Sequence, residues 1–396
     1  MRPENKNILA VNGGSSSIKF ALYATEPGAM PSQWLTGKID RIGLDGAMLT
    51  YTNKRNNEKN ELPAKASSPS EAAAFLLEWL QEQKAGTLAG VGHRVVHGLQ
   101  HRQAAFIDES LLKELGSIVS YDPDHLPGEI ELIQLFREKQ PETPQIACFD
   151  TAFHASLPRQ AQLLPLPRRY DEKGLRKYGF HGLSYAYVME ELTRMDPARA
   201  RGAVILAHLG SGASLAAVKD GVSVDTTMGF TPAGGIVMGT RTGDLDPGAV
   251  WWLLQQEQLD PAAFNRLVNH ESGLLGVSAT SSDMRDLLDR ESSDERAAEA
   301  VSLFCYSIKK AIGAFSAVLG GLDALVFTGG IGERSSTIRS RVCTGLDYLG
   351  VSLDQKANEQ NALFIAAGAS RTAVYAIPTD EEWMIARTAD QLLKEK

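Results

Sequence analysis

Two stretches of the sequence follow the same plan of apolar strand, Gly/Ser turn and apolar strand. The first covers residues 7–23 and turns at Asn-Gly-Gly-Ser-Ser-Ser, positions 12–17. The second covers residues 203–218 and turns at His-Leu-Gly-Ser-Gly-Ala-Ser, positions 208–214. The tip of such a hairpin exposes backbone N–H groups and hydroxyls with few side chains in the way, which suits phosphate oxygens. The repeat therefore predicts a duplicated fold that holds one polyphosphate from two sides.

The length of 396 residues exceeds what one hydrophobic core usually supports, so we expect two domains. Strand and helix patterns alternate along most of the chain, which is typical of α/β architecture. The second hairpin begins near Ala203, and we expect the boundary between Cys148 and Tyr178. No low-complexity linker lies there, which predicts domains in direct contact with a ligand cleft between them.

Three further segments give local predictions. A helix is expected with Ser70 as its N-cap and Gly86 at its end, and another from about Asp294 to Leu319. The second is nearly continuously apolar past Val301, which predicts a helix buried between other elements. The polar residues 52–69 are expected to form a surface excursion.

Composition narrows the classes of partner. A net charge of −8 provides no basic field, so neither nucleic acid nor an anionic membrane is expected as a partner. No apolar run approaches the roughly 18 residues that span a bilayer, and no apolar segment follows a basic start. The three cysteines lack metal-ligand spacing, which favours a reducing compartment, and we predict a cytoplasmic protein.

The phosphate-binding signals are unusual. Neither G-x-x-x-x-G-K-[ST] nor a strand followed by G-x-G-x-x-G is present, so any polyphosphate must be held another way. A third Gly-rich segment, residues 328–335, follows the apolar strand 324–327. It is either a tightly packed strand-to-helix turn or a ledge for a nucleotide base and ribose.

Several polar side chains lie at strand ends or in glycine-bounded turns. Arg94 and Arg241 have small or apolar neighbours, which favours binding of a carboxylate or phosphate by their planar guanidinium groups. Asp150 follows an apolar segment, where it either positions Mg²⁺ or a reacting group or caps the structure. His181 is an imidazole flanked by glycines.

A zinc site at His93, His97 and His101 would require a helix, on which their spacing would align the three imidazoles. Val95, Val96 and the following glycine favour a strand instead, so no zinc site is predicted.

Together these motifs resemble the acetate kinases, short-chain carboxylate kinases of the superfamily that includes sugar kinases, chaperone ATPases and actin. The resemblance extends from Asn12 to about Arg387. It is carried by positions 12–19, 93–98, 149–154, 178–182, 208–212, 238–244, 282–285, 328–333 and 378–382.

The resemblance implies an α/β protein with a duplicated ribonuclease-H-like (actin-like ATPase) fold and a central nucleotide cleft. Residues 1–150 and 383–396 would form the N-terminal domain, and residues 151–382 the C-terminal domain. The implied activity is reversible, ATP- and Mg²⁺-dependent phosphorylation of acetate to acetyl phosphate by direct in-line transfer, with Mn²⁺ as an alternative metal. The implied ligands are a small carboxylate and ATP or ADP, and the implied assembly is a homodimer.

The resemblance also assigns roles to residues. The catalytic set is Asp150, Arg241, Arg94 and His181. Asn12 and Glu381 would hold the metal. The acyl substrate would contact Arg94, Val96, Asp124, Phe180 and Pro232. The nucleotide would contact Lys19, His208, Leu209, Gly210, Ser211, Gly212, Asp283, Met284, Arg285, Gly329, Gly330, Ile331, Gly332 and Glu333.

The chemistry agrees with these roles. A carboxylate is already ionised at neutral pH, so the nucleophile needs no strong base, and catalysis reduces to alignment and charge neutralisation. Two arginines, an imidazole and Mg²⁺ meet that need.

The sequence departs from the family pattern at several positions. Asp124-His-Leu-Pro127 replaces the usual Leu-His-Asn-Pro and places a carboxylate at an apolar acyl-pocket position. Ser211 replaces a usual Asn, Gly234 a usual Glu and Arg334 a usual Asn. Propionate or another small acid is the alternative acceptor. An actin- or chaperone-like ATPase switch is the alternative from a different class, and an inactive kinase is disfavoured because the charged residues are present.

Overall fold

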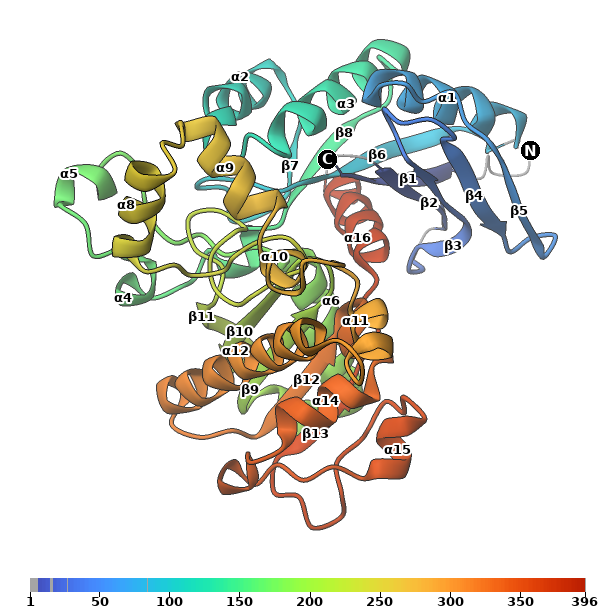
Figure 1. Ribbon diagram of the computed structural model, residues 1–396. Helices are drawn as coiled ribbons and strands as arrows, with labels where there is room; N and C mark the ends of the chain where they lie inside the picture. Colours follow the sequence, from blue (N-terminus) through green and yellow to red (C-terminus); the bar gives the residue numbers. More distant parts are fainter. Residues whose placement is uncertain (1–5, 15–16, 27, 84, 396) are drawn as a thin grey trace. The chain divides into compact units, whose positions relative to one another are not determined.

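The computed structural model describes residues 6–14, 17–26, 28–83 and 85–395 (Figure 1). Residues 15–16 of the first Gly/Ser turn lie outside the described part. The chain divides into two compact units. Unit 1 comprises Met1–Ala155 and Asp380–Lys396, and unit 2 comprises Ser156–Thr379. Each unit has its own β-sheet, and the chain returns to unit 1 for its final helix.

The sheet of unit 1 has the strand order β5-β4-β3-β2-β1-β6-β8-β7. Strands β1 to β5 pair antiparallel with their neighbours in turn, whereas β6 is parallel to β1 and β8 is parallel to β6. The strand bounds are β1 Lys6–Gly13, β2 Ser17–Thr25, β3 Ser32–Asp40, β4 Met48–Asn53, β5 Glu58–Pro63, β6 Leu88–Val95, β7 Ala105–Phe106 and β8 Gln145–Phe149.

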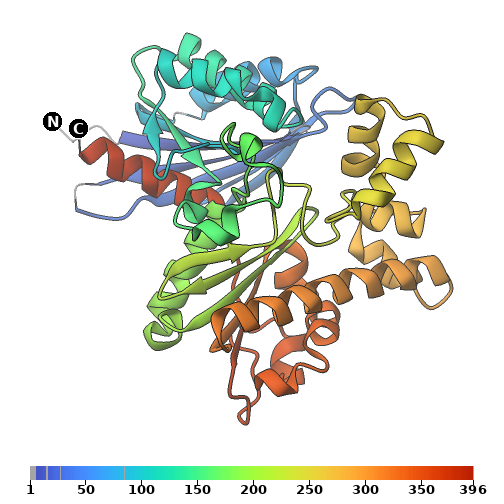
Figure 2. The same ribbon diagram turned by 90° about the vertical axis from the view of Figure 1, so that its left-hand side faces the viewer.

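Helices cover both faces of this sheet (Figures 1 and 2). Helices α1 (Pro69–Glu82) and α3 (Leu126–Lys139) pack on each other and share one face, and α2 (Glu109–Ser117) contacts α3. Helix α16 (Glu381–Lys394) packs along β1 and β6 on the other face. The short 3₁₀ segments η1 (Val119–Tyr121) and η2 (Ala152–His154) complete unit 1.

The sheet of unit 2 has the order β11-β10-β9-β12-β13. Its first pairs are antiparallel and its last two are parallel, which repeats the relation of β3-β2-β1-β6-β8 in unit 1. The bounds are β9 Ala203–Leu209, β10 Ala213–Lys219, β11 Val222–Thr226, β12 Ala324–Thr328 and β13 Ala373–Ala376. The repeat confirms the predicted duplicated α/β fold, and both predicted hairpins are present as β1–β2 and β9–β10.

The helices of unit 2 are mostly short. The longest is α12 (Glu295–Leu319), which packs against β9, β10, α10 and α11. The others are α4 Arg159–Gln162, α5 Arg168–Asp171, α6 Gly182–Met195, α7 Pro197–Ala200, α8 Pro247–Gln256, α9 Pro261–His270, α10 Gly273–Ser278, α11 Met284–Arg290, α13 Gly329–Arg334, α14 Ser336–Cys343 and α15 Gln355–Glu359, with the 3₁₀ segment η3 Asp347–Leu349.

The structure corrects three local predictions. The N-cap of α1 is Ser68 rather than Ser70, because Pro69 occupies the first helical position and the Ser68 side chain accepts from the N–H of Glu71. Residues 58–63 form β5 within the expected surface excursion. Helix α12 is buried on one side only, since Leu303, Tyr306 and Val318 are exposed.

Helix α12 is long and apolar enough, by length and composition alone, to cross a membrane. Its buried side chains, such as Phe304, Ile308 and Ile312, recur at three- and four-residue intervals. Its apolar stripe therefore packs into the core of unit 2.

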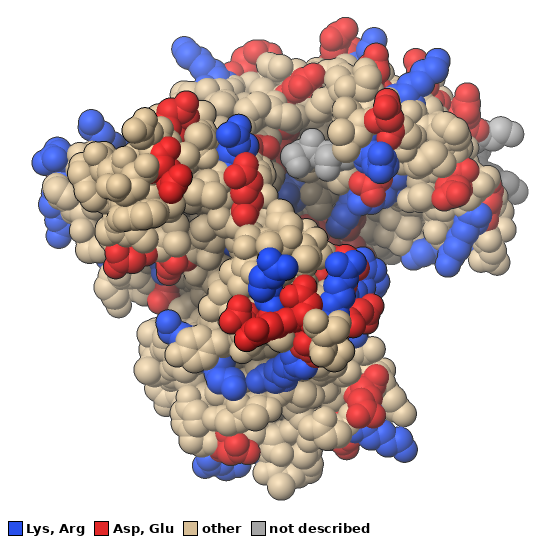
Figure 3. Space-filling view, viewed as in Figure 1, with Lys and Arg blue, Asp and Glu red and all other residues tan. Residues whose placement is uncertain are grey.

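On the surface shown in Figure 3, basic and acidic side chains are interspersed.

Candidate active site

The carboxyl edge of the unit 1 sheet collects several of the predicted residues. Strands β1, β6 and β8 are parallel neighbours, so their carboxyl ends meet at one edge of the sheet. Asn12 lies at the end of β1, Arg94 at the end of β6, and Asp150 directly after β8. Arg94 donates to Asp150 Oδ2 from Nε at 3.0 Å and from Nη2 at 2.5 Å. The fold thus brings two members of the predicted catalytic set, a cation and a buried carboxylate, into contact.

The carboxylates around Arg94 keep its guanidinium charged. Burial alone would lower the pKa of Arg94, but the charges of Asp150, Glu381 and Glu129 outweigh it and raise the pKa above its ordinary value. Arg94 is therefore a permanent cation, suited to a carboxylate or phosphoryl ligand.

The predicted metal ligands also meet at this edge. Asn12 Nδ2 donates to Glu381 Oε2 at 3.0 Å and to Glu382 Oε1 at 3.3 Å, and both glutamates lie in the first turn of α16. Burial and the neighbouring charge of Glu381 raise the pKa of Glu382. Within the described residues, no group of three or more His, Cys, Asp or Glu side chains has the arrangement of a complete metal site. Mg²⁺ in phosphoryl-transfer enzymes commonly uses only one or two protein oxygens together with substrate phosphates, so Asn12 and Glu381 fit it.

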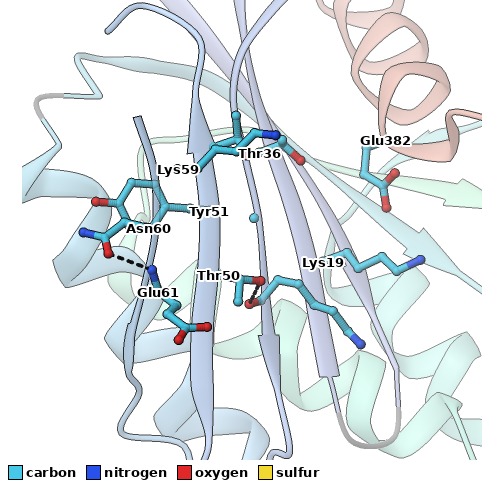
Figure 4. Close-up of a pocket in the computed structure, with 11 residues that line it drawn as sticks. Lys19, Thr36, Thr50, Tyr51, Lys59, Asn60, Glu61 and Glu382 are labelled. Atoms are coloured by element: carbon cyan, nitrogen blue, oxygen red, sulfur yellow. Dashed lines mark hydrogen bonds between the residues drawn. The ribbon is translucent and has the colours of Figure 1, made fainter. Parts of the chain in front are cut away.

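Lys19 lines a groove on the exposed face of β2 to β5 (Figure 4). The groove has a volume of about 630 Å³ and also contains Lys38, Lys59 and Glu382. Lys19 and Lys38 are direct cross-strand partners, so they project from the same face of the sheet. Lys38 Nζ lies 2.7 Å from Asp40 Oδ2, so Lys19 supplies the ammonium group of this pair that is suited to an anionic ligand.

The predicted acyl-binding residues of unit 1 have contrasting environments. Val96 is buried just past β6, and Asp124 is half-buried in the turn before α3. The fully buried carboxylates near this turn are Asp122 and Glu129. Glu129 Oε2 accepts from the backbone N–H of Val96 at 3.0 Å.

The sequence interpretation missed Glu129, although its position carried a signal. Leu126, Ile133 and Phe136 are buried on α3, and Glu129 lies on the same helical face at three- and four-residue spacing. A glutamate on the apolar face of an amphipathic helix indicates a buried and hydrogen-bonded carboxyl group.

In unit 2, the β9–β10 hairpin brings three predicted residues together. A Cβ atom placed on Gly212, at the hairpin tip, would lie 3.4 Å from His181 Nε2 and 3.5 Å from Arg241 Nη1. Arg241 Nη1 also donates to the backbone carbonyl of Pro232 at 3.2 Å. Because position 212 is glycine, no side chain of this residue lies against the His181 imidazole or the Arg241 guanidinium.

Buried hydroxyls hold the two histidines of this cluster in place. His181 Nδ1 lies 2.8 Å from Ser214 Oγ, which also contacts the Tyr185 hydroxyl. His208 Nδ1 lies 2.8 Å from Ser184 Oγ. The imidazoles of His181 and His208 stack with centroids 4.2 Å apart. These contacts direct the Nε2 atom of His181 toward Gly212, and the three hydroxyl partners were missed because their contacts form only in the folded chain.

The predicted nucleotide segments occupy two further places in unit 2. Gly329 has a φ of +76°, and a Cβ atom there would lie 2.7 Å from the Leu209 carbonyl oxygen. Glu333 Oε1 accepts from the N–H groups of Gly329 and Thr379, each at 3.0 Å. The glycine is therefore required by close packing, and a nucleotide ledge at this turn stays a prediction.

The second place is the N-terminus of α11. Asp283 caps this helix by accepting from the N–H of Arg285, and the Arg285 side chain lowers the pKa of Asp283. The side chain of Arg285 is exposed, whereas Met284 is buried. The remaining predicted residues differ in exposure. Those that are buried are Phe180, Leu209 and Gly332, those that are half-buried are Gly210, Pro232 and Ile331, and those that are exposed are Ser211 and Gly330.

The chain is similar to known proteins in both sequence and fold. The model of the acetokinase family matches residues 7–387. A protein of Methylocella silvestris named acetate kinase is 42% identical over 401 residues, covering 98% of each chain. A Citrobacter rodentium protein named propionate kinase is 42% identical over 388 residues, covering 96% of this chain and 95% of the relative. The crystal structure of Porphyromonas gingivalis acetate kinase superposes with a TM-score of 0.87 at 35% identity, covering 99% of this chain and 100% of that chain. The chain therefore belongs to the acetokinase family and is a kinase that acts on a carboxylate.

Proposed function

We propose that the protein catalyses the reversible phosphorylation of acetate by ATP, with Mg²⁺, through direct in-line transfer of the γ-phosphoryl group. The observation that carries this proposal is the placement of one oriented arginine in each unit, each beside other residues of the predicted catalytic or phosphate-binding set. Arg94 is held by Asp150 at the sheet edge of unit 1, and Arg241 lies beside His181 and Gly212 in unit 2. The relative named acetate kinase supports acetate as the acceptor.

The proposed mechanism assigns charge neutralisation to these side chains. The acetate carboxylate is ionised at neutral pH and can attack the γ-phosphorus without a general base. Arg94 would bind this carboxylate, and Asp150 would hold the guanidinium in orientation. Arg241 and His181 Nε2 would stabilise the transferring phosphoryl group, whose charge spreads over its three equatorial oxygens.

The proposed nucleotide and metal roles follow the same chemistry. Asn12 and Glu381 would hold Mg²⁺ or Mn²⁺, which neutralises phosphate charge and aligns the β- and γ-phosphates when bound. Lys19 would contact the phosphates. The hairpin tip 208–212, the α11 terminus 283–285 and the turn 329–333 would contact the remainder of ATP.

Propionate is the second candidate acceptor. Val96 and Phe180, two of the proposed acyl contacts, are buried apolar side chains, and a relative is named propionate kinase. An apolar pocket separates acids that differ by one methylene by only about 10- to 200-fold, so both acids are expected to react.

A second copy of this chain is the proposed protein partner. Helices α8 and α9 contain no residue that is buried, and α8 exposes Trp251 and Trp252. Large exposed aromatics on one helix are typical of a protein interface. We also propose a cytoplasmic location, which the three free, buried cysteines support.

A hydroxylamine trap tests the proposed reaction. The protein is incubated with ATP, Mg²⁺ and hydroxylamine together with formate, acetate, propionate or butyrate. We expect hydroxamate from acetate and propionate, in step with ADP. ADP release that is the same with and without any carboxylate would instead identify an ATPase switch.

A further inference from the structure

Among the buried carboxyl groups of unit 1, Glu129 and Asp122 each have an oxygen that lacks a hydrogen-bond partner among the described residues. The unpartnered atoms are Glu129 Oε1 and Asp122 Oδ2. Their exposed fractions are only 4% and 3%. A buried polar atom without a partner is costly, so such an atom in a native protein calls for a partner, and a ligand from outside the chain can supply one.

Glu129 lies next to residues with proposed roles in binding the acyl substrate. Its Oε2 atom accepts from the N–H of Val96, so its Oε1 atom lies close to the backbone of the same residue. Val96 follows Arg94 by two residues, just past β6. The charges of Glu129 and Arg94 act on each other, so this carboxyl group lies near the proposed carboxylate-binding arginine as well as the backbone of a proposed acyl contact.

Asp122 is the second buried carboxyl group near Glu129. Its Oδ1 atom lies 2.8 Å from His125 Nδ1, and His125 is the N-cap residue of α3, the helix that carries Glu129. Burial is the main cause of the raised pKa of Glu129, and the charge of Asp122 adds to it. The region beside Val96 is thus polar on its α3 side, where an acyl pocket for acetate alone would be apolar.

The protonation of Glu129 favours a neutral partner. Burial raises the pKa of Glu129 to about 8, although Arg94 and the Val96 N–H both lower it. A carboxyl group that is largely protonated at neutral pH both donates and accepts a hydrogen bond, and a hydroxyl group can match either role. An ammonium group would place a second cation beside Arg94, and a methyl group would leave the oxygen unpartnered.

We propose that Glu129 is a specificity-determining residue whose unpartnered oxygen hydrogen-bonds a hydroxyl group on the acyl substrate, so that short hydroxylated acids such as glycolate are acceptors alongside acetate. This role rests on the proposed function, since it requires Arg94 to bind the substrate carboxylate.

The test compares matched acid pairs that differ by one hydroxyl group. The ratio of kcat/KM for glycolate to kcat/KM for acetate is measured in the wild-type protein and in Glu129→Leu. We expect the ratio to fall by at least about tenfold in the variant, because a polar site loses its preference when its hydrogen bond is removed. Propionate with lactate, and propionate with 3-hydroxypropionate, locate the preferred hydroxyl position.

Control variants separate specificity from a structural role. Glu131→Gln removes the charge of an exposed glutamate on the same helix and is expected to leave the ratio unchanged. If Glu129→Leu does not fold, Glu129→Met is used in its place, because methionine keeps the length of the glutamate side chain. A merely structural Glu129 would lower both kcat/KM values equally, and an unchanged ratio would overturn the proposal.

The wild-type protein provides a test without substitution. A kcat/KM for glycolate below about one-hundredth of that for acetate would also overturn the specificity role, since that is the scale on which a purely apolar pocket discriminates. Failure to phosphorylate every acid of the set, acetate included, would instead contradict the proposed function itself.

Discussion

Arg241 is the residue of unit 2 on which the proposed transfer depends most. Its guanidinium lies beside the hairpin tip at Gly212 and donates to the Pro232 carbonyl. We expect Arg241→Ala to lower kcat for acyl phosphate formation by at least about a hundredfold, because a preorganised donor to the developing phosphoryl charge is lost. Hydroxamate formation measures this loss, and calorimetric titration with ATP is expected to show little change in affinity.

Arg266→Ala is the matched control for Arg241→Ala. Arg266 is exposed and paired with Glu271, and an exposed pair of this kind contributes little. Turnover by Arg241→Ala close to that of the control would contradict a catalytic role for Arg241.

Glu129 also predicts a pH dependence of stability. Its folded-state pKa of about 8 exceeds the ordinary value of 4.5, so the native state binds more protons than the unfolded state between these pH values. The contribution of Glu129 to the free energy of unfolding therefore falls as pH rises from about 4.5 to 8, by no more than about 1.4 kcal/mol per pH unit. Denaturant titrations should show Glu129→Gln gaining stability relative to the wild-type protein across this window. A constant difference between the two proteins would show that Glu129 does not titrate there.

The sequence predicts some polar residues of the candidate site but not others. Arg94, Asp150, His181 and Arg241 follow apolar or Gly-rich segments, and this local context was enough to select them as candidates. Ser184 and Ser214 were not identified as partners of the histidines, because their hydroxyls reach His208 and His181 only when the β9–β10 hairpin packs on α6. Asp124 was predicted as an acyl contact from its place in a family motif. Asp122 and Glu129, which the motif does not single out, are the carboxyl groups of this region that the structure buries.

At the scale of elements, the turn between β12 and α13 offers a comparison of adjacent glycines. Gly329 has a positive φ, and any side chain there would collide with the Leu209 carbonyl, whereas a Cβ atom on Gly330 meets nothing within 4 Å. We expect Gly329→Ala to lower the free energy of unfolding by about 1–3 kcal/mol. Gly330→Ala should change it little or raise it slightly, since alanine favours a helix. Equal denaturation midpoints for the two variants would contradict the packing described for this turn.

Hairpins and the longest helix were predicted well from the sequence because their signals are local. Alternating apolar runs around Gly/Ser turns predicted β1–β2 and β9–β10, and Asp294 and Gly320 at the two ends of α12 match its caps. Strand β5 was not predicted, because its sequence Glu-Lys-Asn-Glu-Leu-Pro is polar. It is a sheet edge that pairs with β4, so tertiary pairing outweighs its weak strand propensity.

At the scale of the molecule, the similarity of the two hairpin sequences predicts a duplicated fold. It does not predict the strand order that the two sheets share. Parallel pairing of β1 with β6, and of β9 with β12, joins segments that are far apart in the chain. Such pairings depend on topology rather than on local sequence, and only the family resemblance implied them before the structure did.

The proposed self-association predicts the behaviour of a surface variant. The wild-type protein is expected to have twice the mass of one chain in size-exclusion chromatography with light scattering. Replacing both Trp251 and Trp252 by lysine should produce monomers, because the substitution removes apolar area and adds like charges to the interface. Tyr348→Lys, which changes another exposed aromatic of unit 2, is the control. A wild-type monomer, or a dimer that persists in the double variant, would contradict the assignment of this surface.

The destination of the γ-phosphoryl group tests the central claim most directly. The protein is mixed with ATP labelled at the γ-phosphorus, Mg²⁺ and acetate, and the labelled products are separated at once. We predict that the label appears in acetyl phosphate in an amount equal to the ADP formed, and that little ADP forms when acetate is omitted. Label found only in inorganic phosphate, at a rate indifferent to acetate, would contradict it.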